Sequence, residues 1–466
     1  MRIPSAAFAL AGLLASSALA QQEEAPRPPA LELLERAWKA KDSAGMAAAL
    51  DEAWKADPGS AKKRTLQVLA SESEFFRPAA MGALARHADS KTLAGVIRST
   101  DRRAVGERRW LTYALADRPK EEALEVLTGL LRDSDVLVRA AAVTALAHFG
   151  DAEALRAAAH LLREHPAWKP DSSGDDQHAL QMALFGAFEH VTHKRPPTAK
   201  AAKEALAATA ASKEPAPAAD PEGKPERFTL RGKSFVELRR FNLTFDLGPD
   251  ARVSEERVSV FEKQIIPVAE QMSEASKGVF GPILPASVRL VIADQQRFSA
   301  YAGNSFRPGV SQGNQVVLRD MNPEQTRAVL AHEYVHVLQQ AAFPKQPRWL
   351  QEGIAESLSQ SKKTTSWNLA AVRAARLEAD LTNGVFGSVL NWDSAASSGD
   401  RETRLYRLSH LAIDSLRFGD YGDADLRLFL LMSRIGEGET PETALQSLYD
   451  ADPTELDARL RRWVTR

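Results

Sequence analysis

The order of apolar and polar side chains divides the sequence into two parts of different structural class. From residue 27 to about residue 195, apolar positions recur at the spacing of amphipathic helices, and no strand-like alternation interrupts them. Residues 227–246 then alternate between apolar and polar side chains, which is typical of half-buried strands. Residues 288–293 form a short apolar run that predicts a buried strand. We therefore expect an all-α part followed by a part that mixes strands and helices.

The helical part contains an internal repeat. The pairs Phe76-Arg77, Glu107-Arg108 and Val138-Arg139 lie 31 residues apart, and an Ala-Leu pair follows each of them at the same distance. A period of this length is typical of a helical solenoid, in which each helix pair buries its apolar face against its neighbours. The best copy, residues 133–151, resembles a HEAT repeat, which implies a curved array that serves as a protein-binding scaffold or, alternatively, as a spacer or lid. A fourth unit is expected near Ala183-Leu184.

The N-terminus has the layout of a secretory signal peptide. A basic residue precedes an apolar stretch, and small residues at positions 18 and 20 mark a cleavage site at the end of residues 1–20. The apolar stretch is shorter than the ~18 residues that a transmembrane helix needs. We therefore expect an exported protein, periplasmic or extracellular, with no membrane span.

A change of composition marks the expected domain boundary. Residues 194–226 are rich in Ala, Pro, Lys and Glu, and such a stretch cannot bury enough apolar surface to order itself. It predicts a linker between a helical repeat domain at 21–193 and a second domain at 227–466, in which residues 255–279 predict an amphipathic helix. The expected protein is thus multidomain, with an all-α HEAT-like solenoid followed by an α+β domain.

Charge and composition exclude several classes of function. The chain has 466 residues with 60 Lys and Arg against 61 Asp and Glu, and this balance provides no electrostatic footprint for nucleic acid or another polyanion. It contains no cysteine, so disulfides, thiolate metal ligands and thiol nucleophiles are excluded. Any chemistry must therefore rely on histidine, carboxylate, hydroxyl or lysine side chains.

One helix of the second domain carries the candidate chemistry. A strand at 315–319 is expected to lead into a helix that Asn322 caps. His332 and His336 are four residues apart, so one face of this helix can present both imidazoles to one tetrahedral Zn²⁺. Glu333 then points towards the open coordination position, where water must lose a proton. This spacing predicts a catalytic zinc site with Glu333 as general base.

Two neighbouring motifs resemble a known enzyme family. HEYVH at 332–336 and RWLQEGIAES at 348–357 resemble the gluzincin-type zinc metallopeptidases of the MA clan. The resemblance implies that Glu352 is the third zinc ligand, and Glu356, one helical turn later, is placed to hydrogen-bond a ligand histidine. The chain departs from the family's pattern in the 15 residues between the second histidine and Glu352, a shorter separation than in the best-known members, and in Gln351, which replaces a frequent asparagine.

The same resemblance implies a cleft that binds substrate. A helical lower lobe would close it, and Tyr406 and His410 are candidates to donate a hydrogen bond to the oxyanion of the reaction. An edge strand before the zinc helix would bind the peptide by adding its backbone hydrogen bonds. The residues of that strand are Gln315, Val316, Val317 and Leu318. Residues 301–313, rich in glycine, are expected to form either a mobile loop at the cleft mouth or a plain hairpin.

These observations predict an exported zinc-dependent metallopeptidase whose zincin-like catalytic domain follows the helical repeats. Its substrate would be a peptide or a protein, and Zn²⁺ its cofactor. Two alternatives remain open. In the first, the repeats bind a protein partner and the zinc domain is not catalytic; in the second, the zinc site hydrolyses a non-peptide amide such as a cell-wall component. The sequence does not distinguish endopeptidase from exopeptidase action.

Overall fold

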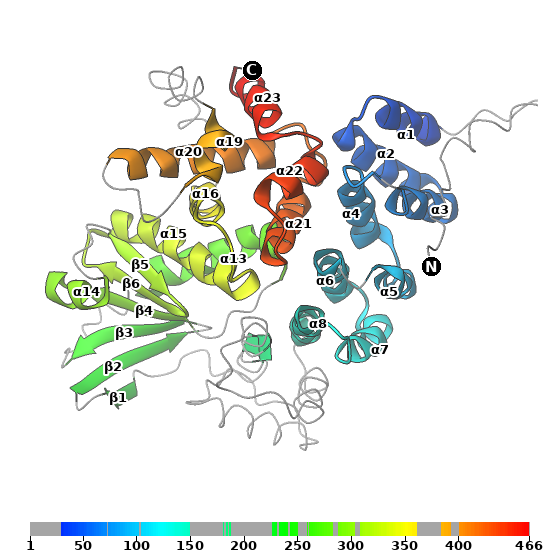
Figure 1. Cartoon of the computed structure of the whole chain (residues 1–466). Coiled ribbons are helices and arrows are strands. Elements are labelled where there is room, and N and C mark those ends of the chain that lie inside the picture. Colours follow the sequence, from blue (N-terminus) through cyan, green and yellow to red (C-terminus); the bar gives the residue numbers. More distant parts are fainter. Residues whose placement is uncertain are drawn as a thin grey trace, which may run out of the picture. The chain divides into compact units, whose positions relative to one another are not determined.

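The computed structural model describes most of the chain, and Figure 1 shows how its helices and strands are arranged. The described residues are 29–71, 73–101, 104–149, 180, 183–184, 186–187, 226–230, 233–240, 243–249, 259, 261–282, 288–302, 308–360, 384–392 and 400–465. The expected signal peptide at 1–20 and residues 194–225 of the expected linker lie outside these ranges. Among the described residues, no helix is both long enough and apolar enough to cross a bilayer.

The chain divides into two compact units. The first joins Met1–Ala88 with Asp420–Asp423, and the second joins Asp89–Gly419 with Ala424–Arg466. The expected boundary at 194–226 falls within the sequence range of the second unit. The first four helices belong to the first unit, and all later helices and strands belong to the second.

The first unit is a set of short helices packed against one another. Its described helices are α1 (Pro29–Lys39), α2 (Ser43–Ala56), α3 (Pro58–Leu69) and α4 (Arg77–His87). Asp42 and Asp57 begin α2 and α3, because each carboxylate accepts hydrogen bonds from backbone N–H groups of the first helical turn. Helix α2 packs against α1, α3 and α4, so the apolar faces of all four helices share one core. The loop Asp420–Asp423 joins this unit through an ion pair of 2.6 Å between Arg86 and Asp423.

The second unit begins with further repeat helices. These are α5 (Ser90–Ser99), α6 (Val105–Ala114), α7 (Lys120–Leu130) and α8 (Val136–His148). The predicted period of 31 residues is confirmed, since Leu84, Leu115 and Leu146 occupy the same position in successive repeats and all are fully buried. Helix α5 packs on α7 and α6 packs on α8, as stacked helix pairs do in a solenoid. Of the expected fourth unit, Ala183 and Leu184 are helical and buried, and most of the surrounding segment lies outside the described residues.

A mixed sheet follows the repeats in the sequence. Its strands are β1 (Glu226–Leu230), β2 (Lys233–Arg240), β3 (Leu243–Pro249), β4 (Val288–Ala293), β5 (Gly309–Gln312) and β6 (Gln315–Arg319). They are ordered β1-β2-β3-β4-β6-β5, with parallel pairing between β3 and β4 and between β4 and β6, and antiparallel pairing elsewhere. The strands predicted at 227–246, 288–293 and 315–319 are therefore confirmed, and so is an α+β arrangement.

The prediction that residues 315–319 form the edge of the sheet is wrong. Strand β6 is paired on both sides, with β4 and with β5, so its backbone is not free to bind a peptide. Val316, Val317 and Leu318 are buried between the layers, and Gln315 pairs with Gln312 at the hairpin end. The edge strands of the described sheet are β1 and β5, and β5 lies next to β6. Because β5 and β6 form a hairpin, residues 309–313 take the hairpin alternative.

Helices form the remainder of the second unit. They are α13 (Ile266–Phe280), preceded by a π-helical turn at Phe261–Ile265, and α14 (Gln295–Ala302), α15 (Pro323–Ala342), α16 (Arg348–Ser359), α19 (Val385–Leu390), α20 (Asp400–Phe418), α21 (Ala424–Gly436), α22 (Pro441–Tyr449) and α23 (Pro453–Thr465). The helix expected at 255–279 is thus interrupted near Pro267, which lacks a backbone N–H and so begins α13 anew. Helix α15 contacts β5, β6, α13 and α16, so it lies between the sheet and the later helices (Figure 1).

One repeat helix shares a core with α15. Arg109 of α6 is buried and donates a hydrogen bond of 3.0 Å to the carbonyl of Ala342, the last residue of α15. The Arg109 guanidinium lies 4.7 Å from the ring centroid of Phe343 and 5.4 Å from that of Phe429. Trp110 packs edge-on against the same Phe429 ring at 5.1 Å. Helix α6 therefore caps the C-terminus of α15, where a cation is stabilised by the helix dipole.

Candidate metal centre

Helix α15 presents the two histidines and the glutamate between them. Asn322 accepts a hydrogen bond of 3.0 Å from the backbone N–H of Gln325, and Pro323 occupies the first turn, so the predicted start of the helix is confirmed. The helix continues for 20 residues and ends at Ala342, before Pro344. It thus runs without interruption through 332–336, and the spacing of four residues places both imidazoles on one face.

Helix α16 supplies the third candidate ligand, and its sequence explains how closely it packs. Trp349 and Leu350 are buried in the core. A Cβ atom at Gly353 would lie 2.5 Å from the carbonyl oxygen of Ser409 in α20, so only glycine permits this approach of the two helices. In the W-L-x-E-G pattern, the buried Trp349 and Leu350 precede Glu352, and Gly353, which contacts α20, follows it. These contacts on both sides fix the orientation of Glu352.

Hydrogen bonds fix the short connection between α15 and α16. The side chain of Gln351 donates to the carbonyl of Gln346 at 2.7 Å, and the side chain of Gln346 donates to the carbonyl of Met432 at 2.9 Å. The Gln351 side chain thereby binds a backbone carbonyl of the reversal itself, and the Gln346 side chain attaches the reversal to α21. The short separation in the sequence between the second histidine and Glu352 is accommodated in this way.

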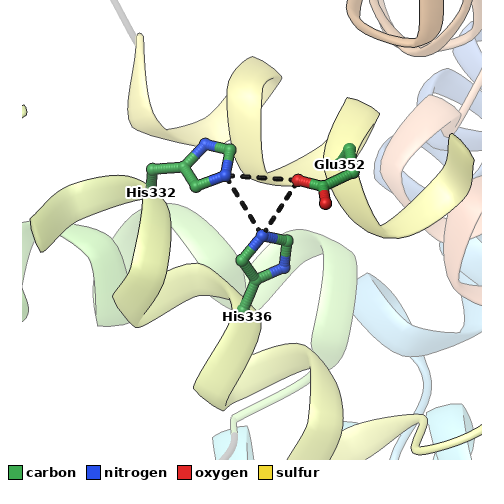
Figure 2. A group of neighbouring side chains, drawn as sticks. All are labelled: His332, His336 and Glu352. Atoms are coloured by element: carbon green, nitrogen blue, oxygen red, sulfur yellow. Dashed lines mark hydrogen bonds and ion pairs between the residues drawn. The ribbon is translucent and has the colours of Figure 1, made fainter. Parts of the chain in front are cut away.

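The three candidate ligands converge on one point, as Figure 2 shows. The Nε2 atoms of His332 and His336 are 3.1 Å apart, and the Oε2 atom of Glu352 lies 3.3 Å and 3.2 Å from them, respectively. Ligands at about 2.0–2.1 Å from a tetrahedral Zn²⁺ are separated from each other by about 3.3–3.4 Å. The donor atoms therefore already stand at nearly the spacing that one zinc ion requires.

Two further side chains hold these ligands in place. The Oε1 atom of Glu356 lies 3.3 Å from Nδ1 of His332, and Gln360 donates a hydrogen bond to the other oxygen of Glu356. A proton on Nδ1 leaves the Nε2 lone pair of His332 free for a metal. The hydroxyl of Tyr406 in α20 donates to Oε1 of Glu352 at 2.9 Å. Glu356 thus makes the contact expected of it from the sequence.

Charge and burial strongly perturb the cluster. Burial lowers the pKa of His332, but hydrogen bonds with Glu352 and Glu356 outweigh that effect and raise the pKa to about 10. Burial raises the pKa of Glu352, but hydrogen bonds from His332 and His336 outweigh it and lower the pKa far below its ordinary value. The pKa of Glu356 is also lowered, against the effect of burial, by its contact with His332. The carboxylates are therefore charged at neutral pH and favour a cation at the cluster.

The cluster opens into a cleft of about 1180 Å³. The cleft is lined by residues of β5, α15, α16 and α20. Glu333 also lines it and is only 9% exposed, with its side chain against β5, where a Cβ atom at Gly309 would lie 3.0 Å from Cγ of Glu333. Among the described contacts, the Glu333 carboxylate has no hydrogen-bond partner, so it is available to a molecule in the cleft. Gly309, Val310 and Ser311 of the edge strand border the same space.

The structure brings most of the candidate residues together and leaves others apart. His410 does not line the cleft; its Nε2 atom lies 3.1 Å from Oδ2 of Asp414, and this carboxylate raises the pKa of His410 although burial lowers it. That position does not support the predicted oxyanion role of His410. Residues 315–318 also do not line the cleft. Sequence reasoning left a hairpin at residues 301–313 as one of two alternatives and did not expect β5 to be the edge strand. It also missed Arg348, which approaches Glu352 at 3.7 Å.

Comparison with known proteins identifies the repeats. The family model of HEAT repeats matches residues 106–170, which include α6, α7 and α8. The HEAT-like character predicted for the helical part is therefore confirmed over this segment, and such repeats suggest protein interaction. The matched segment does not include the metal cluster. No curated protein and no solved structure matches the chain.

Proposed function

We propose that this chain is a zinc-dependent metallopeptidase of zincin-like fold that hydrolyses peptide bonds and is exported to the periplasm or the extracellular space. The observation that carries the proposal is the convergence of His332, His336 and Glu352 in a cleft that also holds Glu333 and β5, an edge strand of the described sheet. Each component has a role in amide hydrolysis, and together they line one cleft.

The donor set fits zinc. Two imidazoles and one carboxylate are the protein ligands of a common class of catalytic zinc site, which keeps its fourth position open. The donor separations of 3.1, 3.2 and 3.3 Å agree with tetrahedral coordination. When bound, Zn²⁺ supplies Lewis acidity that makes water a stronger acid and a carbonyl a better electrophile.

The side chains of this protein perform the proton transfers and the positioning. Glu333, buried at the cleft wall, accepts the proton of the attacking water and delivers it to the leaving amine. Glu356 holds His332 in the tautomer whose Nε2 is unprotonated. Among the described strands, β5 pairs with β6 alone, so an extended peptide can add its backbone to the other side of Gly309–Gln312 and lie across the cleft beside Glu333.

A second candidate function is protein binding by the helical repeats. The HEAT-repeat match favours it, since stacked repeats expose a continuous surface on which a partner can dock. This function is compatible with the first, because a partner bound to the repeats would select the substrate that is cleaved or the place where the protein acts. It stands alone only if the metal cluster performs no hydrolysis.

The test of the peptidase proposal separates metal binding from chemistry. The purified protein should contain close to one zinc per chain by elemental mass spectrometry, and should cleave members of a peptide library while leaving non-peptide amides intact. Glu333→Gln should retain zinc and lose activity by about 100- to 10,000-fold, since general base catalysis contributes that much. Glu352→Ala should lose both zinc and activity.

A matched control is available on the same helix. Glu324 lies exposed in the first turn of α15, so Glu324→Gln makes the same chemical change far from the cleft and should leave zinc content and activity unchanged. A Glu333→Gln protein as active as the wild type would refute the assigned role. Zinc content near zero that added zinc cannot restore would refute the metal site, and hydrolysis of non-peptide amides alone would identify a different amidase.

A further inference from the structure

The two carboxylate oxygens of Glu352 face different partners. Oε2 lies 3.3 Å and 3.2 Å from the two histidine Nε2 atoms. Oε1 instead accepts a hydrogen bond of 2.9 Å from the hydroxyl of Tyr406, and the Nε atom of Arg348 lies 3.7 Å from it. One oxygen is thus directed at the metal position and the other is held by α16 and α20.

The groups around Oε1 form a connected cluster of four side chains, with Arg348 in contact with the other three. Arg348 and Glu352 lie one turn apart on α16, and Glu402 and Tyr406 lie one turn apart on α20. Arg348 forms an ion pair with Glu402 and donates to the Tyr406 hydroxyl at 3.3 Å, and that hydroxyl in turn donates to Glu352. The Arg348 guanidinium also lies 4.7 Å from the ring centroid of Trp392, which fixes its plane.

We propose that Tyr406 and Arg348 are positioning residues that keep Glu352 bound to the metal through Oε2 alone. This inference rests on the zinc site of the proposed function. A carboxylate that coordinated through both oxygens would occupy one more position around the ion. Because hydrogen bonds from Tyr406 and attraction by Arg348 retain Oε1, that position stays open for the reactants.

The geometry distinguishes this role from direct catalysis by Tyr406. A phenol has a single O–H donor, and in Tyr406 that donor is directed at Glu352. To donate to a reaction oxyanion, the hydroxyl would have to leave the carboxylate. The two roles therefore predict different effects of removing the hydroxyl on zinc affinity measured without substrate. If Tyr406 positions Glu352, the affinity falls; if Tyr406 contacts only the oxyanion, the affinity does not change.

The experiment measures zinc affinity in the full-length protein by competition with a chromophoric chelator, without substrate. Tyr406→Phe removes the hydroxyl and should weaken zinc binding about 10- to 100-fold, the usual effect of losing a partner that orients a ligand. Arg348→Lys keeps the charge but cannot contact Tyr406, Glu352 and Glu402 at once, so it should weaken binding by a smaller factor. In the cobalt-substituted protein, Tyr406→Phe should reduce the visible absorption, because a fifth ligand atom weakens the bands of tetrahedral Co²⁺.

Tyr334→Phe is the matched control. Its hydroxyl lies 3.4 Å from Oγ of Ser273, and the residue does not line the cleft, so zinc affinity should not change. The inference is overturned if Tyr406→Phe binds zinc as tightly as the wild type, and a lower kcat with unchanged affinity would assign Tyr406 to the oxyanion instead. A wild-type protein that binds zinc but cleaves no peptide refutes the peptidase proposal alone. The zinc affinities of Tyr406→Phe and the wild type would still test the positioning role of Tyr406. A wild-type protein that binds no zinc refutes both.

Discussion

The contact between α6 and the end of α15 predicts that a residue of the HEAT-like segment stabilises α15, the helix that carries the candidate ligands His332 and His336. The perturbation is Arg109→Met, which keeps most of the apolar stem and removes the guanidinium. The wild-type guanidinium donates to the carbonyl of Ala342 and lies over the rings of Phe343 and Phe429. We expect the substitution to lower the free energy of unfolding and to loosen the last turn of α15.

The magnitude follows from the contacts that are lost. A hydrogen bond from a charged donor contributes about 1.5–3 kcal/mol, and a desolvated cation over aromatic rings contributes about 1–2 kcal/mol. Methionine offsets part of this loss, because it removes the desolvation penalty of a buried charge and retains contact with the rings. We therefore expect a net decrease of about 1–3 kcal/mol in the free energy of unfolding of the second unit.

Two measurements test this expectation. Urea denaturation followed by tryptophan fluorescence reports the change in unfolding free energy, and hydrogen exchange with mass spectrometry reports the opening of the last turn of α15. Arg98→Met is the matched control, since Arg98 is exposed on α5 and its loss should change stability by less than about 0.5 kcal/mol. If Arg109→Met changed stability no more than this control and left exchange in α15 unaltered, the capping argument would be refuted.

Two further predictions concern helix packing and pH. Gly353→Ala should destabilise the protein by about 1–3 kcal/mol in thermal or urea unfolding, because the added Cβ would lie 2.5 Å from the carbonyl oxygen of Ser409. The control Gly95→Ala should not destabilise it, since no atom lies within 4 Å of the added Cβ. Equal effects of the two substitutions would contradict the proposed close contact. Burial lowers the pKa of His332, but hydrogen bonds led by Glu352 outweigh it and raise the pKa from 6.5 to about 10. Zinc must therefore displace a proton from His332 in order to bind. The affinity of the protein for zinc should then rise by up to tenfold per pH unit between about pH 6.5 and 9. Without zinc, the same shift stabilises the fold below pH 6.5, and this contribution disappears as the pH rises through about 10; a zinc affinity independent of pH in chelator competition would contradict both statements.

The features of the site that depend on spacing within one helix were predictable from the sequence. His332 and His336 are four residues apart on α15, and Glu352 and Glu356 are four residues apart on α16. Helical geometry alone places each pair on one face. The repeat period was predictable for the same reason, because buried leucines at a constant interval require only that neighbouring helix pairs pack alike.

The features that depend on contacts distant in the sequence were not predictable in this way. Strand β5 has only four residues and begins with Gly309, so it lacks the alternation that identifies a strand, and its place outside β6 is decided by the sheet order. Arg348 and Tyr406 are separated by 58 positions and meet only because Gly353 lets α16 approach α20. The local signals of this cluster were the spacings of four between Arg348 and Glu352 and between Glu402 and Tyr406.

The position of α6 changes how the two candidate functions can be separated. The HEAT-repeat match includes α6, and α6 also supplies Arg109 to the end of the helix that holds His332 and His336. Deleting the repeats would therefore remove a cap of α15 together with any partner surface, and loss of activity would not show which of the two was needed. A fragment of the repeats alone would expose Trp110, which packs against Phe429 in the intact protein. Point substitutions separate the two functions better than deletion, because Glu333→Gln removes the proposed general base while leaving every contact of α6 in place.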